Sequence, residues 1–438
     1  GVEYGTGPLG IGVSVSSAFA HAEKLQGTDK KSFFLMGDGE CQEGQVHEMI
    51  ENAYHHKLNN LIGFVDYNKV QLTASLKDTL EIDVIKFFEG GQWEVIECNA
   101  HDFQDIWRAL GEAMNATKPV VIIGHTIMGQ GSDFMQPAGE AHDPAWHGKA
   151  PGHDDIAADI SALETTEEEK SALEAFRKKH VTWHPKHAQY PAKLSKTNVN
   201  PGEAIEYEAG TVTDCRSAYG KALLDLAKNN KQVIALTADL KGSVKTDGVA
   251  KELPKQYIEC GIAEQHMISA AGGFSLSGFT PFASTFGAFI SSRAKDQARV
   301  NDINYCNVKM VATHCGLSVG EDGPTHQAID DMGSFLGFYN THVIEPADAN
   351  QCDRIIRYVA SHFGNFYVRM GRHKFAVLTK EDGTPYYDKD YVYEFGRSDV
   401  IREGSDITIA ASGASITEAL KAREELEANG GPSVEVVA

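Results

Sequence analysis

The chain has 438 residues, of which 42% are hydrophobic and 23% are charged; these values are typical of a soluble globular protein with two or three domains. Its net charge of −21 argues against nucleic-acid binding, which requires basic surfaces. No segment has the apolar length of a membrane span, and no signal peptide is visible. The seven Cys residues are scattered without a CxxC pair, which favours reduced thiols and a cytoplasmic location.

The first 70 residues predict a glycine-rich loop followed by a helix and a strand–helix–strand unit. The predicted elements are a loop at Gly1–Gly12, a helix at Val13–Leu25, strands at Ser32–Met36 and Leu61–Val65, and a helix within Glu40–Leu58. Two strands that a helix joins pair in parallel with a right-handed crossover. Their carboxyl ends therefore meet at the edge where open α/β sheets bind ligands.

Asp38, in Gly37-Asp38-Gly39, and Asn68 follow these two strands directly. With the backbone carbonyl of Val70 they offer an all-oxygen half-shell, which suits Mg²⁺ or Ca²⁺ completed by phosphate oxygens and water. Gly39 lets the backbone approach a phosphate closely, and the following helix directs its positive end there. The alternative is an ordinary strand-to-helix turn, with Asn68 an ordinary turn residue.

Strands and helices continue to alternate along the chain, apart from a proline-containing stretch of little periodicity before residue 212. After it, Asp214–Asn229 and Phe286–Val300 are expected to be helices. We therefore expect an α/β protein with two doubly wound parallel-sheet domains and the start of a third. The expected boundaries are 1–190 for the first domain, 191–212 for a linker, 213–380 for the second domain and 381–438 for an incomplete third. Both ends look cut, and we expect the first domain to lack its N-terminal part.

Several motifs resemble those of the transketolase family over nearly the whole chain. They are GPLG at 7–10, GDG at 37–39 with Asn68, WHGKAP at 146–151, AEQHM at 263–267, FASTF at 282–286, GEDGPTHQ at 320–327 and the later Arg372. The pair of GDG and Asn68 resembles the signature of thiamine diphosphate enzymes, in which Asp and Asn hold the metal that holds the diphosphate. The resemblance thus implies two thiamine-diphosphate-binding domains, one for the diphosphate and one for the pyrimidine.

The resemblance implies thiamine diphosphate and Mg²⁺ (or Ca²⁺) as cofactors. Asp38, Asn68 and the Val70 carbonyl would hold the metal. The cofactor-binding residues would be Gly7, Leu9, Asp38, Gly39, Asn68, His147, Glu264, Phe286 and Phe289. A Glu264 carboxyl bonded to the pyrimidine nitrogen favours the imino tautomer that takes the C2 proton of the cofactor. Phe289 matches the stacking residue better than Phe286. A helix-capping Glu264 and two core phenylalanines are the simpler alternatives.

The substrate residues also follow from the resemblance. The substrate phosphate would be bound by Arg216, Ser243, His314 and Arg372, since two guanidinium forks and two short donors suit a dianion. Asp322 would accept a hydrogen bond from the acceptor's C2 hydroxyl, and His326 would contact the donor ketose. Glu264, His147 and His326 would be catalytic, with the two histidines moving the proton as the carbon–carbon bond breaks.

The implied activity is reversible transfer of a two-carbon ketol unit from xylulose 5-phosphate to ribose 5-phosphate through a thiamine diphosphate enamine, in the pentose phosphate pathway. The implied assembly is a homodimer with active sites at the interface. One alternative is a related thiamine diphosphate transferase of the dihydroxyacetone synthase or 1-deoxyxylulose-5-phosphate synthase type. The other is a truncated paralogue that binds cofactor without turnover.

Overall fold

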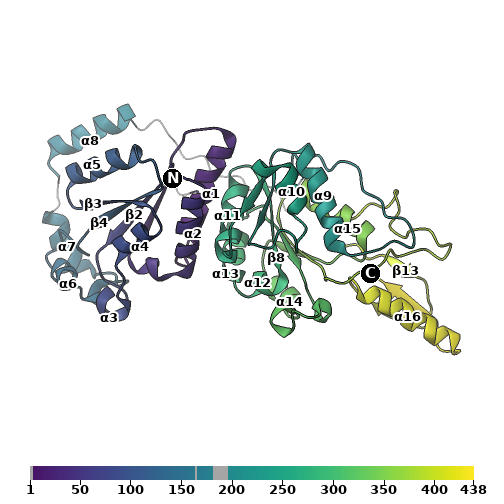
Figure 1. The fold of residues 1–438 in the computed structure, drawn as a ribbon. Coiled ribbons are helices and arrows are strands. Elements are labelled where there is room, and N and C mark those ends of the chain that lie inside the picture. Colours follow the sequence, from purple (N-terminus) through teal and green to yellow (C-terminus); the bar gives the residue numbers. More distant parts are fainter. Residues whose placement is uncertain (1–2, 163–164, 181–195) are drawn as a thin grey trace. The chain divides into compact units, whose positions relative to one another are not determined.

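The computed structural model describes residues 3–162, 165–180 and 196–438. The chain forms two compact units, one made of Gly1–Asp29 with Ala192–Ala438 and the other of Lys30–Pro191 (Figure 1). The two units are defined by packing, and the N-terminal residues therefore belong with the later part of the chain.

This division does not test the predicted domain boundaries, which stay a prediction. Residues 191–195 of the predicted linker lie outside the described residues.

The unit of Lys30–Pro191 contains a four-stranded, fully parallel sheet in the order β1-β2-β4-β3. Its strands are β1 (Ser32–Gly37), β2 (Leu61–Tyr67), β3 (Glu94–Asn99) and β4 (Val120–His125). Its α-helices are α2 (Gly44–His55), α3 (Leu76–Leu80), α4 (Val84–Gly90), α5 (Phe103–Met114), α6 (Gln136–Glu140), α7 (His153–Ala162) and α8 (Glu167–His180). Short 3₁₀ turns lie at η1 (Gly39–Gln42) and η2 (Pro144–Trp146).

The pairing of β1 with β2 confirms the expected strand–helix–strand unit. Gly37 lies opposite Asp66 in the parallel register, so the residues that follow both strands emerge at one edge. The helix expected within Glu40–Leu58 is shorter than predicted. A 3₁₀ turn buries Cys41 first, and Glu43 then takes an extended backbone that caps α2.

The other unit is built on a six-stranded, fully parallel sheet in the order β10-β11-β9-β8-β6-β7. Its strands are β6 (Val233–Thr237), β7 (Tyr257–Glu259), β8 (Thr280–Phe286), β9 (Lys309–Thr313), β10 (Thr341–Ile344) and β11 (Asn365–Arg369). Its helices are α1 (Ile11–Gln26), α9 (Cys215–Asn229), α10 (Asp247–Glu252), α11 (Glu264–Leu276), α12 (Gly287–Ser291), α13 (Lys295–Ile303), α14 (Asp331–Leu336) and α15 (Ala349–Ser361). The 3₁₀ turns are η3 (Pro254–Gln256), η4 (Leu317–Val319) and η5 (Pro324–His326).

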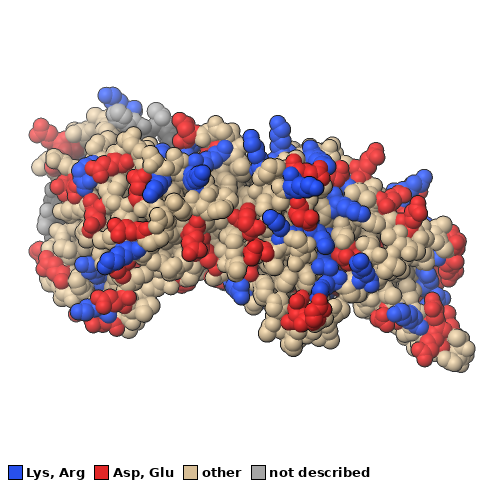
Figure 2. All heavy atoms as spheres, in the orientation of Figure 1, with Lys and Arg blue, Asp and Glu red and all other residues tan. Residues whose placement is uncertain are grey.

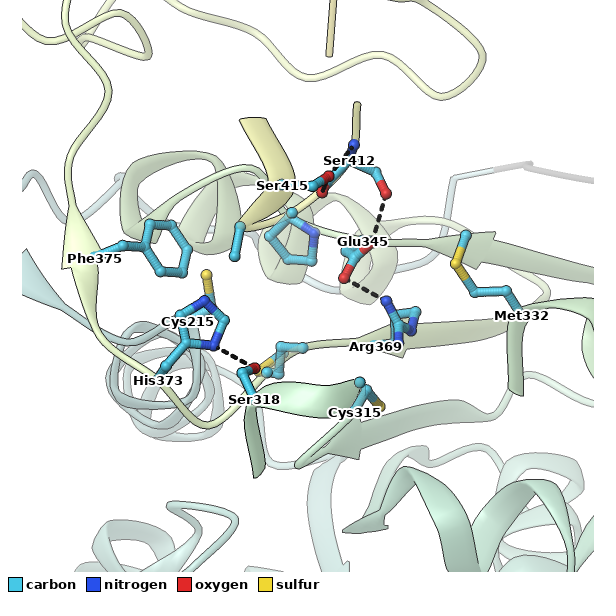
Figure 3. A pocket seen from close by; sticks show the side chains of 16 residues that line it. Cys215, Cys315, Ser318, Met332, Glu345, Arg369, His373, Phe375, Ser412 and Ser415 are labelled. Atoms are coloured by element: carbon cyan, nitrogen blue, oxygen red, sulfur yellow. Dashed lines mark hydrogen bonds and ion pairs between the residues drawn. The ribbon is translucent and has the colours of Figure 1, made fainter. Parts of the chain in front are cut away.

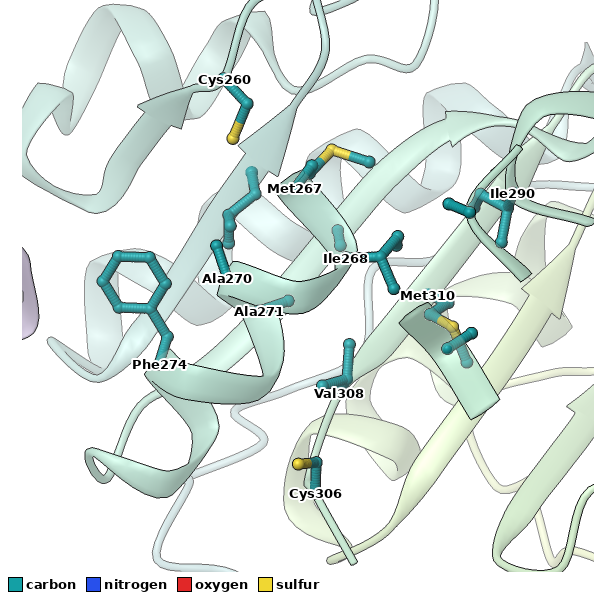
Figure 4. Packing of buried hydrophobic residues seen from close by; sticks show 14 of the residues in the cluster. Cys260, Met267, Ile268, Ala270, Ala271, Phe274, Ile290, Cys306, Val308 and Met310 are labelled. Atoms are coloured by element: carbon teal, nitrogen blue, oxygen red, sulfur yellow. The ribbon is translucent and has the colours of Figure 1, made fainter. Parts of the chain in front are cut away.

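Alternation along the strands divides this unit's core into two layers. Ile234, Ala283 and Met310 face a cluster that includes α1 and α11 (Figure 4). Val233 and Phe282 face a second cluster that includes α9 and α15. Because successive side chains of a strand point to opposite faces, each strand contributes to both layers.

The helix expected over Phe286–Val300 is instead two helices. Strand β8 runs through Phe286, α12 follows, and α13 starts only at Lys295. The amides of Arg293 and Ala294 both donate to the Phe289 carbonyl, at 3.0 and 3.2 Å. This closure ends α12 one turn after Phe289 and places Arg293 in the break.

The C-terminal segment forms a small mixed sheet in the order β13-β15-β14. Strands β14 (Ile407–Ala410) and β15 (Val434–Val437) are parallel and joined by α16 (Ser415–Ala428), whereas β13 (Val400–Arg402) is antiparallel to β15. A two-stranded antiparallel sheet joins β5 (Val212–Thr213) to β12 (Phe375–Ala376). The predicted α/β class with parallel sheets is therefore confirmed.

Charged side chains of both signs are interspersed over the face that Figure 2 displays. All seven cysteines are buried and free. Within the described residues, no helix is long and apolar enough to cross a membrane.

Helix α1 packs along α11 at a close approach that depends on glycine. Ser14 Oγ lies 3.1 Å from His266 Nδ1, and Gln26 Nε2 donates to the Ser277 carbonyl at 2.9 Å, so the two helices run in the same direction. A Cβ on Gly273 would lie 2.7 Å from the Val15 carbonyl oxygen. Any larger residue at this position must push the helices apart.

We expect Gly273→Ala to lower the free energy of unfolding by about 1–3 kcal/mol through overpacking. Gly111→Ala is the matched control, because Gly111 is also helical and a Cβ there meets nothing within 4 Å. It should raise stability by about 0.5–1 kcal/mol through helix propensity alone. Urea unfolding followed by circular dichroism measures both, and equal effects of the two substitutions would contradict the packing argument.

Candidate functional site

The predicted site residues fall into two groups, one in each compact unit. The unit of Lys30–Pro191 holds Asp38, Gly39, Asn68, Val70 and His147. The other unit holds Gly7, Leu9, Arg216, Ser243, Glu264, Phe286, Phe289, His314, Asp322, His326 and Arg372. Each group is a half-site with its own geometry.

In the first half-site, Asp38 and the turn after β2 are held together by hydrogen bonds. The Lys69 amide donates to Asp38 Oδ2 at 2.6 Å, and the Val70 amide donates to Asn68 Oδ1 at 2.8 Å. Lys69 has a φ of 62°, a left-handed conformation that non-glycine residues adopt rarely. The structure thus brings Asp38, Asn68 and Val70 to one place at the sheet edge.

The oxygen atoms of this half-site are largely shielded from water, with Asp38 and Val70 buried and Asn68 half-buried. Asp38 is 2% exposed, and burial raises the pKa of its carboxyl, against the opposing effect of the Lys69 and Gly39 amides. A cation would offset that desolvation. No group of three or more His, Cys, Asp or Glu side chains that could hold a metal occurs among the described residues. The set here has one carboxylate, so it fits a hard cation only if ligand phosphate oxygens complete the shell.

His147 and Gly39 lie around the same turn. His147 is exposed at the end of η2, and its charge acts on Asp38. Gly148 sits beside Leu72, with its would-be Cβ 3.5 Å from Leu72 Cδ1. A Cβ on Gly39 would lie 2.6 Å from Gln71 Nε2. A side chain at Gly39 would therefore crowd the surface that the proposed diphosphate needs.

In the second half-site, Glu264 is a buried carboxylate at the start of α11. Its side chain is 3% exposed, and its Oε2 atom accepts a hydrogen bond from Arg293 Nη1 at 2.8 Å. The Arg293 guanidinium also lies over the Phe289 ring, 4.8 Å from its centroid. Sequence analysis did not identify Arg293. Its spacing of four residues from Phe289, one helical turn, is a signal that could have found it.

Aromatic rings connect Glu264's surroundings to the predicted substrate residues. Phe286 and Phe289 stack with centroids 5.6 Å apart and planes inclined by 24°. The ring centroid of Phe286 also lies 3.9 Å from that of His314. The His326 ring centroid lies 5.8 Å from that of Phe286 and 5.3 Å from that of Phe289. Phe286 is buried and Phe289 half-buried, so these rings offer both core packing and a wall on which a flat ligand can stack.

The GPLG turn lies at the same end of the helix pair as Glu264. Gly7 and the 57%-exposed Leu9 precede α1, which runs parallel to α11. The preceding loop is fixed by Tyr4 Oη, which donates to Asn301 Oδ1 at 2.8 Å, and by Asn304, which bonds both backbone groups of Gly5.

The predicted phosphate-binding residues surround Arg216. Its guanidinium donates to the Ser243 carbonyl at 3.1 Å and to the Arg372 carbonyl at 3.0 Å. Its Nη1 atom is 3.3 Å from His314 Nε2, and Asp214 pairs with its Nε at 3.2 Å. These contacts bring all four predicted residues together around a guanidinium that is 11% exposed.

Arg372 is held by the loop after β9. Its Nη2 atom pairs with Glu321 Oε1 at 2.7 Å, and its Nη1 atom donates to the Val319 carbonyl at 2.9 Å. Asp322 Oδ2 lies 3.5 Å from the same Nη1. Glu321 and Asp214 are further residues that sequence analysis did not assign, although Glu321 stands within the GEDGPTHQ motif.

His314 is neutral in this setting. Burial, aided by the positive charges of Arg216 and Arg372, lowers its pKa from 6.5 to about 4, while Asp322 opposes the shift. Its φ of 58° is left-handed, a strained backbone that persists where the surroundings fix it. The ring can therefore accept or donate a hydrogen bond at neutral pH without adding charge.

A cavity of about 260 Å³ lies among the sequence neighbours of these residues but is not lined by them (Figure 3). Glu345 stands in it between Arg369 Nη1, at 2.5 Å, and Ser412 Oγ, at 2.6 Å. His373 and Ser318 form a second bonded pair at 2.8 Å. The cavity's charges are thus largely paired with one another.

Two family models match the chain. Residues 1–198 match the transketolase thiamine diphosphate binding domain, and residues 212–376 match the transketolase pyrimidine binding domain. The two matches coincide with the two half-sites, apart from the GPLG loop and α1.

Curated relatives align with almost the whole chain. Transketolase-like protein 2 of Mus musculus is 33% identical over 98% of this chain and 66% of that protein. Transketolase-like protein 1 of Bos taurus is 31% identical over 98% of this chain and 69% of that protein. Transketolase of Homo sapiens is 31% identical over 96% of this chain and 64% of that protein. The chain thus spans about two thirds of the length of these relatives.

Solved transketolase structures share the fold. The enzyme from Campylobacter jejuni superposes with a TM-score of 0.77 at 27% identity, covering 100% of this chain and 71% of that one. Transketolase from Leishmania mexicana superposes with a TM-score of 0.75 at 23% identity, covering 70% of that chain. This second likeness is one of fold alone.

We expect Arg293→Met to lower the free energy of unfolding by about 2–3 kcal/mol, because it removes the partner of a buried carboxylate. The double variant Glu264→Gln with Arg293→Met should recover more than half of that loss. Arg108→Met is the control, since its exposed ion pairs contribute less than about 1 kcal/mol. A double variant no more stable than Arg293→Met would contradict this pairing.

We expect the His314 ring to titrate near pH 4 and its pKa to shift upward when inorganic phosphate is added, as a bound anion favours the protonated ring. Because its folded pKa lies below 6.5, the unfolded chain takes up the proton first. Stability is then lost as pH falls from about 6.5 to about 4, more in the wild type than in His314→Gln. Histidine NMR titration checks the pKa, and a midpoint near 6.5 would refute it.

Proposed function

Because the chain belongs to the transketolase family, we propose that it transfers a two-carbon ketol unit between sugar phosphates with thiamine diphosphate as cofactor. The donor would be xylulose 5-phosphate and the acceptor ribose 5-phosphate. The observation that carries the proposal is the continuity of the second half-site. The phosphate-binding cluster of Arg216 and Arg372 joins the aromatic wall of Glu264 through the contact of His314 with Phe286.

The residues present fit this cofactor. A buried carboxylate, linked through Arg293 to the stacked rings of Phe289 and Phe286, suits an aminopyrimidine, and the oxygen atoms of Asp38 and Asn68 suit a metal-bound diphosphate. When bound, thiamine diphosphate supplies a nucleophilic carbon and an electron sink for the broken carbon–carbon bond. Mg²⁺ or Ca²⁺ would be held by Asp38, Asn68 and the Val70 carbonyl.

The chain's own residues divide the remaining work. Arg216, Ser243, His314 and Arg372 would bind the substrate phosphate, and Asp322 and His326 would contact the sugar hydroxyls. Glu264 would hydrogen-bond the pyrimidine nitrogen. His147 and His326 would move the proton at the reacting carbon, since an imidazole can take up a proton as a base and return it as a general acid.

We further propose a homodimer in which each active site combines the Asp38 half-site of one copy with the Glu264 half-site of its partner. Neither half-site is complete alone, since one carries the diphosphate-binding oxygens and the other the pyrimidine and phosphate contacts. We propose that the enzyme acts in the cytoplasm, in the pentose phosphate pathway.

Two other functions compete with this proposal. Transketolase-like proteins are as similar to the chain as transketolase itself, which keeps a cofactor-binding paralogue without turnover as the second candidate. A related two-carbon transferase, of the dihydroxyacetone synthase or 1-deoxyxylulose-5-phosphate synthase type, is the third.

A coupled assay with xylulose 5-phosphate, ribose 5-phosphate, Mg²⁺ and thiamine diphosphate tests the proposal. We expect turnover that Glu264→Ala lowers by about 100-fold or more, a loss of the size that one preorganised polar group causes. Asp38→Ala should abolish metal-dependent cofactor binding, followed by circular dichroism. Cofactor binding without transfer would favour the paralogue, and turnover with formaldehyde or pyruvate instead would favour a related transferase.

A further inference from the structure

The loop after β9 closes on Arg372 through two acidic side chains. Glu321 pairs with Arg372 Nη2 at 2.7 Å, and Asp322 lies 3.5 Å from Nη1. Gly316, Gly320 and Gly323 all have positive φ values, from 77° to 89°, which gives the loop its tight course. The loop thus places carboxylates where the proposed function expects a phosphate.

The two arginines of the cluster differ in how firmly they are held. Arg216 is 11% exposed and bonds to backbone carbonyls and to Asp214, whose side chain is 4% exposed. Arg372 is 33% exposed, and its partner Glu321 is 76% exposed. An exposed ion pair is weak, so the bond between Arg372 and Glu321 is the one that an incoming anion can replace.

Phosphate is a stronger partner for this guanidinium than one exposed carboxylate. A dianion forms charge-assisted, bidentate bonds to arginine. Further partners stand nearby, since Arg216 donates to the Arg372 carbonyl and lies 3.3 Å from His314, and the charges of both arginines act on His314. The exchange would also move the loop, because Glu321 and Asp322 are adjacent and both contact Arg372.

We propose that Glu321 occupies the phosphate position of the ligand-free site, and that the substrate phosphate displaces it and thereby frees Asp322 from Arg372. This inference rests on the proposed function, since it names how the same site selects phosphorylated sugars. Asp322, once freed, can accept a hydrogen bond from the sugar. A sugar without phosphate leaves both carboxylates on Arg372, so Glu321 is a specificity-determining residue.

The test is the binding of ribose 5-phosphate to Glu321→Gln, measured by calorimetry on the full chain without cofactor. The substitution keeps the side chain's shape and removes the competing charge. We expect the Kd to fall by about 2- to 5-fold, the range that an exposed ion pair contributes. Binding of unphosphorylated ribose should not change. Glu418→Gln is the matched control, because Glu418 is 71% exposed in a comparable ion pair with Lys421, and it should leave the Kd unchanged.

A double variant keeps this test specific. In an Arg372→Ala background, Glu321→Gln should give no gain, because the ion pair that it releases is already absent. Wild type and Glu321→Gln binding ribose 5-phosphate equally, or the variant binding more weakly, would overturn the exchange and leave the proposed function standing. Failure of the wild type to bind ribose 5-phosphate at all would also overturn the exchange, whereas the proposed function is overturned by the absence of transfer in the coupled assay with cofactor.

Discussion

The parallel direction of the strands is the constraint on which the second half-site depends. In a fully parallel sheet every strand ends at the same edge. Ser243 follows β6, Glu264 follows β7, Phe286 ends β8, His314 follows β9 and Arg372 follows β11. Residues up to 129 positions apart in sequence, Ser243 and Arg372, therefore meet around one guanidinium. Reversing any one strand would carry its residue to the opposite edge.

Electrostatics then determines what this edge can bind. The two arginines stand close together, and the structure compensates them with Asp214, Glu321 and the carbonyls of Ser243 and Arg372. Burial of the first arginine fixes it, whereas exposure of the second leaves its partner exchangeable. Burial lowers the pKa of His314, and the same two charges add to the effect. Two arginines thus stand close together at this edge in a chain of net charge −21, each paired with carboxylates that differ in exposure.

The first half-site also depends on parallel strands that end at one edge of a sheet. Parallel pairing of β1 with β2 places Asp38 beside the turn that contains Asn68 and Val70, and backbone amides hold both side chains. The predicted ligand set of Asp38, Asn68 and the Val70 carbonyl holds one carboxylate, so its affinity for a cation depends on a ligand that brings phosphate oxygens. Metal and cofactor binding are thus expected to be coupled.

The sequence by itself determined the α/β class, the pairing of the strands around Asp38 and Asn68, and the candidate residues, because apolar runs and turn motifs are local features. Its motifs also indicated the family. Only the tertiary structure decided which of these side chains meet. The break between α12 and α13 that aims Arg293 at Glu264, the ion pair of Glu321 with Arg372 and the packing of α1 on α11 all join residues distant in sequence or depend on backbone closure. No local pattern encodes such contacts, since they arise only when the sheet brings its strand ends together.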